Sequence, residues 1–101
     1  MSGPWLNYQH LYYFWSVARE GGVSLAAKKL RLAQPTVSGQ VHALENSLGT
    51  KLLERSGRKL VLTDAGRTAM RHADVIFGQG RDLVEALAGR GQAPPDRKSV
   101  V

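Results

Sequence analysis

The sequence predicts a mainly α-helical fold, in which three helices and a small β-hairpin precede one long helix. Three observations predict it. Residues 7–48 hold three helical patterns separated by tight connections, residues 51–62 hold two short apolar runs around a Gly-containing turn, and residues 63–88 repeat apolar residues at heptad spacing. Three helices followed by a hairpin, with a tight turn between the second and third, form a winged helix-turn-helix.

The length of 101 residues suffices for one domain. We expect a winged helix-turn-helix unit over residues 7–62 and a linker or dimerisation helix over 63–89. Residues 90–101 contain Pro94 and Pro95 and are expected to form a flexible hinge toward a further domain that this chain does not contain. The chain is therefore expected to be a fragment of a longer protein.

The first expected helix spans residues 7–20. Asn7 is a plausible N-cap, and the Gly21-Gly22 pair ends the helix. One face of this helix is apolar, with residues at i, i+3, i+4 and i+7: Leu11, Phe14, Trp15 and Ala18.

The second expected helix is short, residues 25–30, with Ser24 as its cap. A connection over residues 31–33 leads to a third helix over 34–48, where Pro35 suits the first turn and Gly49 ends the helix. Its expected buried stripe follows spacings of four, three and four residues: Val37, Val41, Leu44 and Leu48.

Burial of that stripe turns the opposite side of the third helix outward. The outward side has no large apolar side chain and no acid: Pro35, Thr36, Gly39, His42, Ala43 and Asn46, with Ser38 and Gln40 on its flanks. Such a face fits a major groove and offers hydrogen bonds to base edges, while the helix N-terminus favours a phosphate. Taken alone, the same residues also suit a plain solvated surface.

The expected hairpin places Arg55, Arg58 and Lys59 near its tip. Beside the third helix, these cations form a wing that can press against phosphates or enter a minor groove. A solvated turn is the alternative interpretation of the same residues.

The long helix begins with Thr63 as its cap and Asp64 in its first turn, and is expected to end near Ala88. One stripe, formed by Met70, Phe77 and Val84, is expected to cover the body of the fold. A second stripe at heptad spacing predicts a two-fold homodimer along this helix. Its expected interface residues are Ala69, Ala73, Ile76, Gly80, Leu83 and Leu87.

Charge and composition restrict the function further. The net charge is +6, and residues 1–62 hold eight Lys and Arg against three Asp and Glu, which favours a polyanionic partner. The chain has no cysteine, no apolar run long enough to span a bilayer and no secretory signal, so a cytoplasmic protein without a membrane contact is expected.

The three histidines, His10, His42 and His72, lie on separate expected helices. None has a carboxylate or a second histidine at i±4 spacing, so no second metal ligand or acid–base partner is expected beside any of them. The sequence predicts no enzyme, no metal and no cofactor.

Five motifs occur in a fixed order. They are Ser-Leu-Ala-Ala-Lys-Lys-Leu at residues 24–30, Gln-Pro-Thr-Val-Ser-Gly-Gln at 34–40, Leu-Glu-Asn-Ser-Leu-Gly at 44–49, Leu-Leu-Glu-Arg at 52–55 and Leu-Thr-Asp-Ala-Gly at 62–66. Together they resemble the DNA-binding domain of the LysR-type transcriptional regulators, over about residues 7–89. The strings at residues 13–15 and 38–40 resemble the subgroup that regulates sodium/proton antiporter genes.

The resemblance implies that Gln34, Pro35, Thr36 and Ser38 approach bases and phosphates, and that Arg55 is the wing arginine. It also implies that the long helix pairs two subunits and that an effector-binding domain follows the hinge. Two positions depart from the family: Gly39 stands where many members have Arg or Lys, and Ala33 stands where many have a capping Ser. The first departure removes an expected guanine contact.

Sequence-specific binding of double-stranded DNA, as a dimer on a pseudo-palindromic site, is therefore the expected function. The residues expected to contact DNA are Gln34, Pro35, Thr36, Ser38, Gly39, His42, Arg55, Arg58 and Lys59. Two alternatives stay open: a stand-alone architectural protein that binds DNA without sequence preference, and a protein-interaction module on the same fold. The operator, the effector and any oligomer beyond the dimer are open as well.

Overall fold

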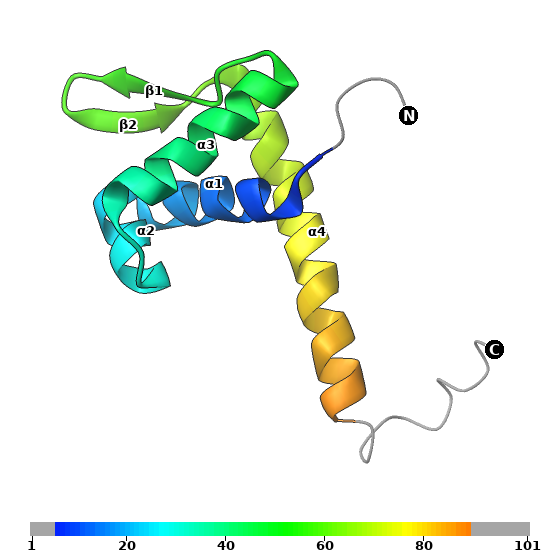
Figure 1. The fold of residues 1–101 in the computed structure, drawn as a ribbon. Helices are drawn as coiled ribbons and strands as arrows, with labels where there is room; N and C mark the ends of the chain where they lie inside the picture. The colour runs from blue at the N-terminus through cyan, green and yellow to red at the C-terminus, as the bar shows by residue number, and fades with distance from the viewer. Residues whose placement is uncertain (1–5, 90–101) are drawn as a thin grey trace.

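A computed structural model describes residues 6–89. The elements follow in the order α1 (Tyr8–Glu20), α2 (Val23–Leu30), α3 (Gln34–Leu48), β1 (Leu53–Ser56), β2 (Lys59–Leu62) and α4 (Asp64–Ala88). In Figure 1, α1 to α3 form a body, the hairpin projects beside α3, and α4 runs away from the body. The predicted winged helix-turn-helix with a long following helix is confirmed. The expected hinge over residues 90–101 lies outside the described residues.

The core lies where α1, α2 and α3 meet. Its largest fully buried side chains come from α1, α3 and the segment before β1: Phe14, Val17, Val37, Leu44 and Leu52. Ala26 and Ala27 on α2 are also buried, and their small side chains let α2 approach its neighbours closely. This packing fixes α3 with one side inward, which positions the outward face considered below.

The expected caps of α1, α3 and α4 are present. The Asn7 side chain accepts from the backbone N–H of His10 at 3.0 Å, and the Thr63 hydroxyl accepts from that of Gly66 at 2.9 Å. Gly49 ends α3 with a left-handed φ of 74°. The predicted Ser24 cap is wrong, because α2 begins at Val23 with Gly22 as an N-cap that offers no side-chain bond.

The buried side of α3 differs from the predicted stripe at its C-terminal end. Val37, Val41 and Leu44 are buried as expected, but Leu48 is 41% exposed and Glu45 is only 6% exposed. The chain after α3 turns back over Glu45, whose carboxylate accepts hydrogen bonds from the amides of Leu52 and Leu53 at 2.8 and 3.2 Å. The buried side of α3 therefore ends with an acid, Glu45, and does not include Leu48.

The hairpin is a two-stranded antiparallel sheet. Leu53 pairs with Leu62 at its base, and Ser56 pairs with Lys59 at its tip. The turn between the strands uses Gly57 at a φ of 66°, a conformation that residues with a Cβ rarely adopt.

The N-terminal half of α4 is fastened to α1. The rings of Trp15 and Phe77 lie 4.8 Å apart, and Trp15 Nε1 donates to Asp74 Oδ1 at 2.8 Å. Ala73 is completely buried, and Ala69, Met70 and Ile76 pack against the same core. The predicted interface position of Ala73 is therefore wrong, because this side chain has no surface left for a second copy.

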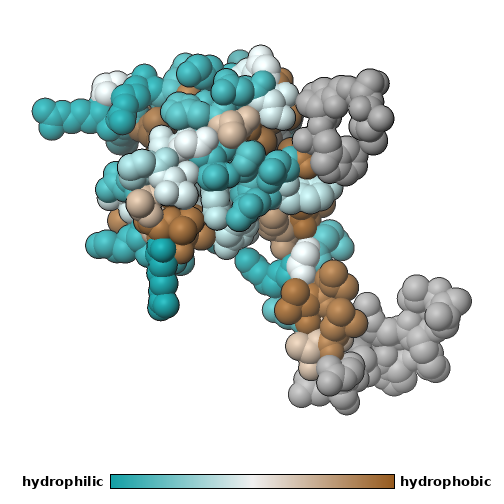
Figure 2. Space-filling model, in the orientation of Figure 1, coloured by the Kyte–Doolittle hydropathy of each residue, from teal (hydrophilic) through white to brown (hydrophobic). Residues whose placement is uncertain are grey.

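The C-terminal half of α4 extends past the body of the fold (Figure 1). Leu83, Val84 and Leu87 are each about 60% exposed there, and hydrophobic surface gathers over this part of the helix in Figure 2. The sequence assigned one stripe to the body and the other to a partner. In the structure the two halves of the helix differ instead: both stripes pack inward before Phe77, and both are exposed after it. Val84, expected to cover the body, is exposed.

Candidate nucleic-acid interface

The outward side of α3 forms one continuous polar surface, which we call the reader face. Its exposed residues are Pro35, Thr36, Gly39, His42 and Asn46, and Ser38 lies half-buried at its edge. Gln34, also exposed, starts the helix, and its amide donates to the Ser24 hydroxyl at 3.4 Å. Ala33 provides no side-chain cap, so the positive end of α3 stays open toward the same surface.

The wing brings one cation to the reader face. Arg55 on β1 lines a hollow together with Val23, Gln34, Pro35 and Ser38. Residues from three elements, α2, α3 and β1, therefore converge at the N-terminal half of the reader helix. A hollow lined by a guanidinium, an amide and a hydroxyl suits an anionic oxygen.

Arg58 and Lys59 lie apart from this hollow, in the turn of the hairpin and at the start of β2, and both are exposed. Within residues 6–89, no ion pair engages Arg55, Arg58 or Lys59. The wing cations are thus available to an external anion.

The sequence interpretation missed a second hollow, at the C-terminal half of α3. Its lining residues are His42, Glu45, Asn46, Gly49, Thr50 and Lys51. His42 Nδ1 lies 3.3 Å from Glu45 Oε1, because residues at i,i+3 spacing, like those at i,i+4, share one side of a helix. The described residues nevertheless hold no cluster of three or more side chains suited to a metal ion.

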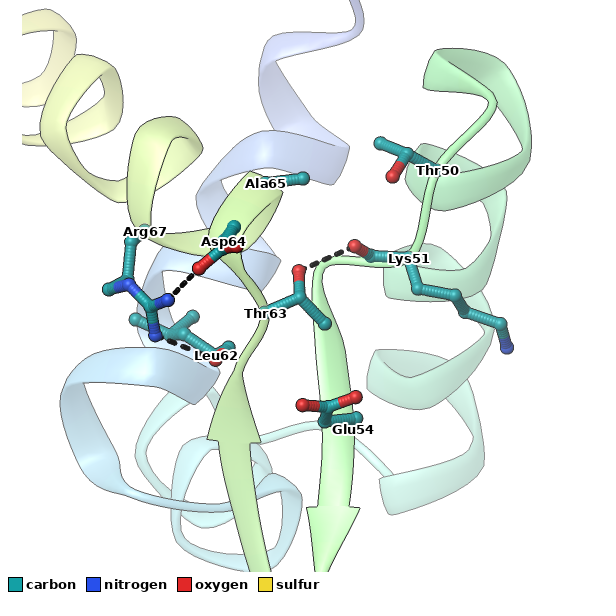
Figure 3. Close-up of a pocket in the computed structure, with 8 residues that line it drawn as sticks. All are labelled: Thr50, Lys51, Glu54, Leu62, Thr63, Asp64, Ala65 and Arg67. Carbon is teal, nitrogen blue, oxygen red and sulfur yellow. Dashed lines mark hydrogen bonds and ion pairs between the residues drawn. The ribbon is translucent and has the colours of Figure 1, made fainter.

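The base of the wing is joined to the start of α4, as Figure 3 shows. The Thr63 hydroxyl donates to the backbone carbonyl of Lys51 at 2.6 Å, and Arg67 pairs with Asp64 one turn into the helix. A Cβ on Gly66 would collide with the carbonyl oxygen of Leu52. The wing and α4 therefore meet through close backbone contact, which explains why the motif at residues 62–66 needs both a Thr and a Gly.

These features define the class of the protein: a winged helix-turn-helix domain with a polar reader face, a basic wing and a long fourth helix. The model of the bacterial regulatory helix-turn-helix proteins of the lysR family matches residues 8–67. The chain belongs to this family.

Relatives and solved structures agree with the assignment. The transcriptional activator protein NhaR of Escherichia coli (strain K12) is 40% identical over 93 residues, which cover 92% of this chain and 31% of NhaR. The BenM DNA-binding domain, in a crystal structure with catB site 1 DNA, is 31% identical with a TM-score of 0.78 and covers 88% of this chain and 100% of that chain. The CbnR DNA-binding domain, in complex with DNA, is 40% identical with a TM-score of 0.68 and covers 82% and 99%.

The chain spans about a third of the length of the curated relatives it matches. Among the described residues, no helix is long and apolar enough to cross a membrane.

Proposed function

We propose that this chain binds double-stranded DNA sequence-specifically, as the DNA-reading part of a bacterial transcription regulator acting in the cytoplasm. The observation that carries the proposal is the hollow in which Arg55 of the wing meets Gln34, Pro35 and Ser38 of α3. It brings a phosphate-binding cation beside polar side chains that can address base edges.

The relatives support the proposal. The BenM and CbnR domains are described in complexes with DNA, and NhaR is described as a transcriptional activator. Both DNA complexes resemble this chain over more than four-fifths of its length. No catalytic step and no cofactor enters the proposal.

The reader face would enter the major groove. Gln34, Thr36 and Ser38 offer hydrogen-bonding groups at its N-terminal end, and Gly39 lies at its centre without a side chain. Arg55, Arg58 and Lys59 would contact phosphates or the neighbouring minor groove, because exposed cations on a hairpin can follow the DNA backbone.

A two-fold dimer through α4 completes the proposal. Leu83 and Val84 are 59% and 63% exposed on a helix that has left its own domain. Apolar surface of this kind is covered when two copies of the helix pack together. Of the interface residues expected from the sequence, the proposal retains Gly80, Leu83 and Leu87, whereas Ala69 and Ile76 pack mainly within the protomer. The dimer would present two reader helices to successive major grooves, roughly 34 Å apart.

Selection of bound duplexes from a random DNA pool tests the function. We expect enrichment of a pseudo-palindromic site, and binding of that site at least about a thousandfold tighter than of random duplex at physiological salt. Equal, salt-dependent affinity for all sequences would instead support the architectural alternative. No salt-dependent binding to any duplex would support a protein-interaction module.

A further inference from the structure

The function proposed above assigns no phosphate contact to the hollow at the C-terminal half of α3, whose lining includes His42 and Asn46 of the reader face and residues of the motif at 44–49. We propose that it is a second DNA phosphate site, in which His42 binds the phosphate as an imidazolium and Glu45 orients it. The inference rests on the proposed function, because it names a further contact to the same duplex.

Glu45 has an arrangement that holds a side chain in place. Its Oε2 accepts from the amides of Leu52 and Leu53, and its Oε1 faces His42 Nδ1 at 3.3 Å. The carboxylate is buried, whereas the His42 side chain is 63% exposed. A buried acid that is itself fixed by two backbone amides therefore anchors the inner nitrogen of an exposed imidazole.

The chemistry of this pair determines what the outer nitrogen of His42 can do. An ionised carboxylate only accepts, so Nδ1 must carry a hydrogen, and Nε2 is left toward solvent. In the neutral ring Nε2 is an acceptor and repels a phosphate oxygen. In the imidazolium it is a charged donor, which a phosphate oxygen accepts strongly.

The remaining lining residues suit a phosphate. Asn46 and Thr50 offer neutral donors, and Lys51 adds a cation. Figure 3 shows the Lys51 side chain extending away from Thr63 and Asp64. Glu45 and Lys51 are the charged residues that line this hollow with His42, and the charged side chains of the wing are not among its lining residues. A phosphate bound beside His42 adds negative charge, which stabilises the imidazolium in the complex.

The location agrees with a backbone contact. His42 and Asn46 lie on the exposed reader face, on the side from which the chain leads into the wing. A DNA strand that passes between the reader face and the wing would first meet the hollow lined by Arg55. It would meet the hollow lined by His42 about two helical turns farther along α3.

Binding should therefore take up protons. The affinity for the selected duplex is expected to rise about tenfold or more from about pH 8 to about pH 6, since each protomer of the dimer gains one proton. Calorimetry in two buffers of different ionisation enthalpy counts these protons directly.

Substitutions separate the contact from its orientation. His42→Gln keeps hydrogen-bonding atoms but cannot titrate, so its affinity should change less than about twofold over the same pH range. Glu45→Gln keeps an acceptor for the Leu52 amide but removes the carboxylate that orients the His42 ring. Proton uptake on binding should therefore fall, while the fold, checked by circular dichroism, is retained. His72→Gln on α4 is the matched control and should keep the wild-type pH dependence.

Methylphosphonate scanning identifies the phosphate, because each substitution neutralises one phosphate in turn. One position per half-site should weaken wild-type binding but leave His42→Gln unaffected. Full pH dependence in His42→Gln, or an absence of proton uptake by a wild-type protein that still selects its site, would overturn this inference while leaving the proposed function intact. Failure to bind any duplex would overturn the proposed function itself.

Discussion

Arg55 and Ser38 line the same hollow, but we expect them to contact different parts of the DNA. A guanidinium on a hairpin reaches phosphates, which every duplex presents, whereas a hydroxyl on the reader helix can reach base edges. Arg55→Ala should weaken binding to all sequences about equally and lower the slope of log K against log salt by about two per dimer.

Ser38→Ala is the contrasting variant for that measurement. It should alter the preferred bases more than the overall affinity and should leave the salt slope unchanged. An Arg55→Ala protein with the wild-type salt slope would count against a phosphate contact by the wing.

Gly39 carries a cost that nothing within the protomer explains. A Cβ at this position meets no atom within 4 Å, yet a helical glycine costs about 1 kcal/mol relative to alanine. We expect Gly39→Ala to raise the melting temperature by about 4–8 °C and to weaken binding to the selected site, because the added methyl keeps the helix from approaching base edges.

Gly78→Ala provides the control for this prediction. Gly78 is also helical with open space at its Cβ, but it lies on α4, away from the reader face. It should stabilise the protein without changing DNA affinity. Tighter binding by Gly39→Ala would show that the missing side chain serves no close approach.

The buried side of α3 is predictable from the sequence only in part. Helical periodicity placed Val37, Val41 and Leu44 inward, because apolar residues at these spacings have one energetically favoured side. It could not place Glu45, whose burial depends on amides contributed by Leu52 and Leu53 after the chain has turned back. Leu48 is exposed in exchange, at the end of the helix where the core no longer reaches.

At the level of elements, the sequence predicts the caps of α1, α3 and α4 but not the start of α2, where the expected Ser24 cap is absent. Asn7, Gly49 and Thr63 each act within three or four residues of chain, so local sequence determines them. The connection between the wing and α4 could not be predicted, because it depends on how closely Gly66 approaches Leu52 across the base of the hairpin.

That connection supports a prediction about stability. Gly66→Ala would force its methyl into the Leu52 carbonyl and against Leu62, so we expect a loss of about 1–3 kcal/mol or more in the free energy of unfolding. Urea denaturation measures it, and Gly78→Ala in the same helix should stabilise instead. Equal stability of Gly66→Ala and the wild type would mean that the wing and α4 are not held this closely.

For the whole molecule, the arrangement of α4 decides how two reader helices can be held together. Its first half belongs to the core of one protomer, through Trp15, Ala73 and Phe77, and its second half lies beyond that core. A rigid connection of this kind would transmit the geometry of a dimer to the wing, because Thr63 and Gly66 join the start of α4 to the hairpin base.

The division of α4 also determines which substitution tests the dimer cleanly. Ile76 was expected at the dimer interface, but it packs against the protomer's own core, so an acid at this position would unfold the domain as well. Leu83 is 59% exposed beyond the core. Leu83→Asp should therefore leave the melting of the winged domain nearly unchanged and reduce the mass in light scattering from that of a dimer to that of a monomer.

DNA binding by Leu83→Asp then measures how much dimerisation contributes to the affinity for DNA. A protein that places two reader helices on one palindrome gains the second contact as an intramolecular event, so loss of the dimer should lower affinity for the full site by about a hundredfold or more. Affinity for an isolated half-site should stay within about twofold of the wild-type value, since α3 and the hairpin lie far from the C-terminal end of α4 in Figure 1. A dimeric Leu83→Asp protein would show that the exposed half of α4 does not form the interface.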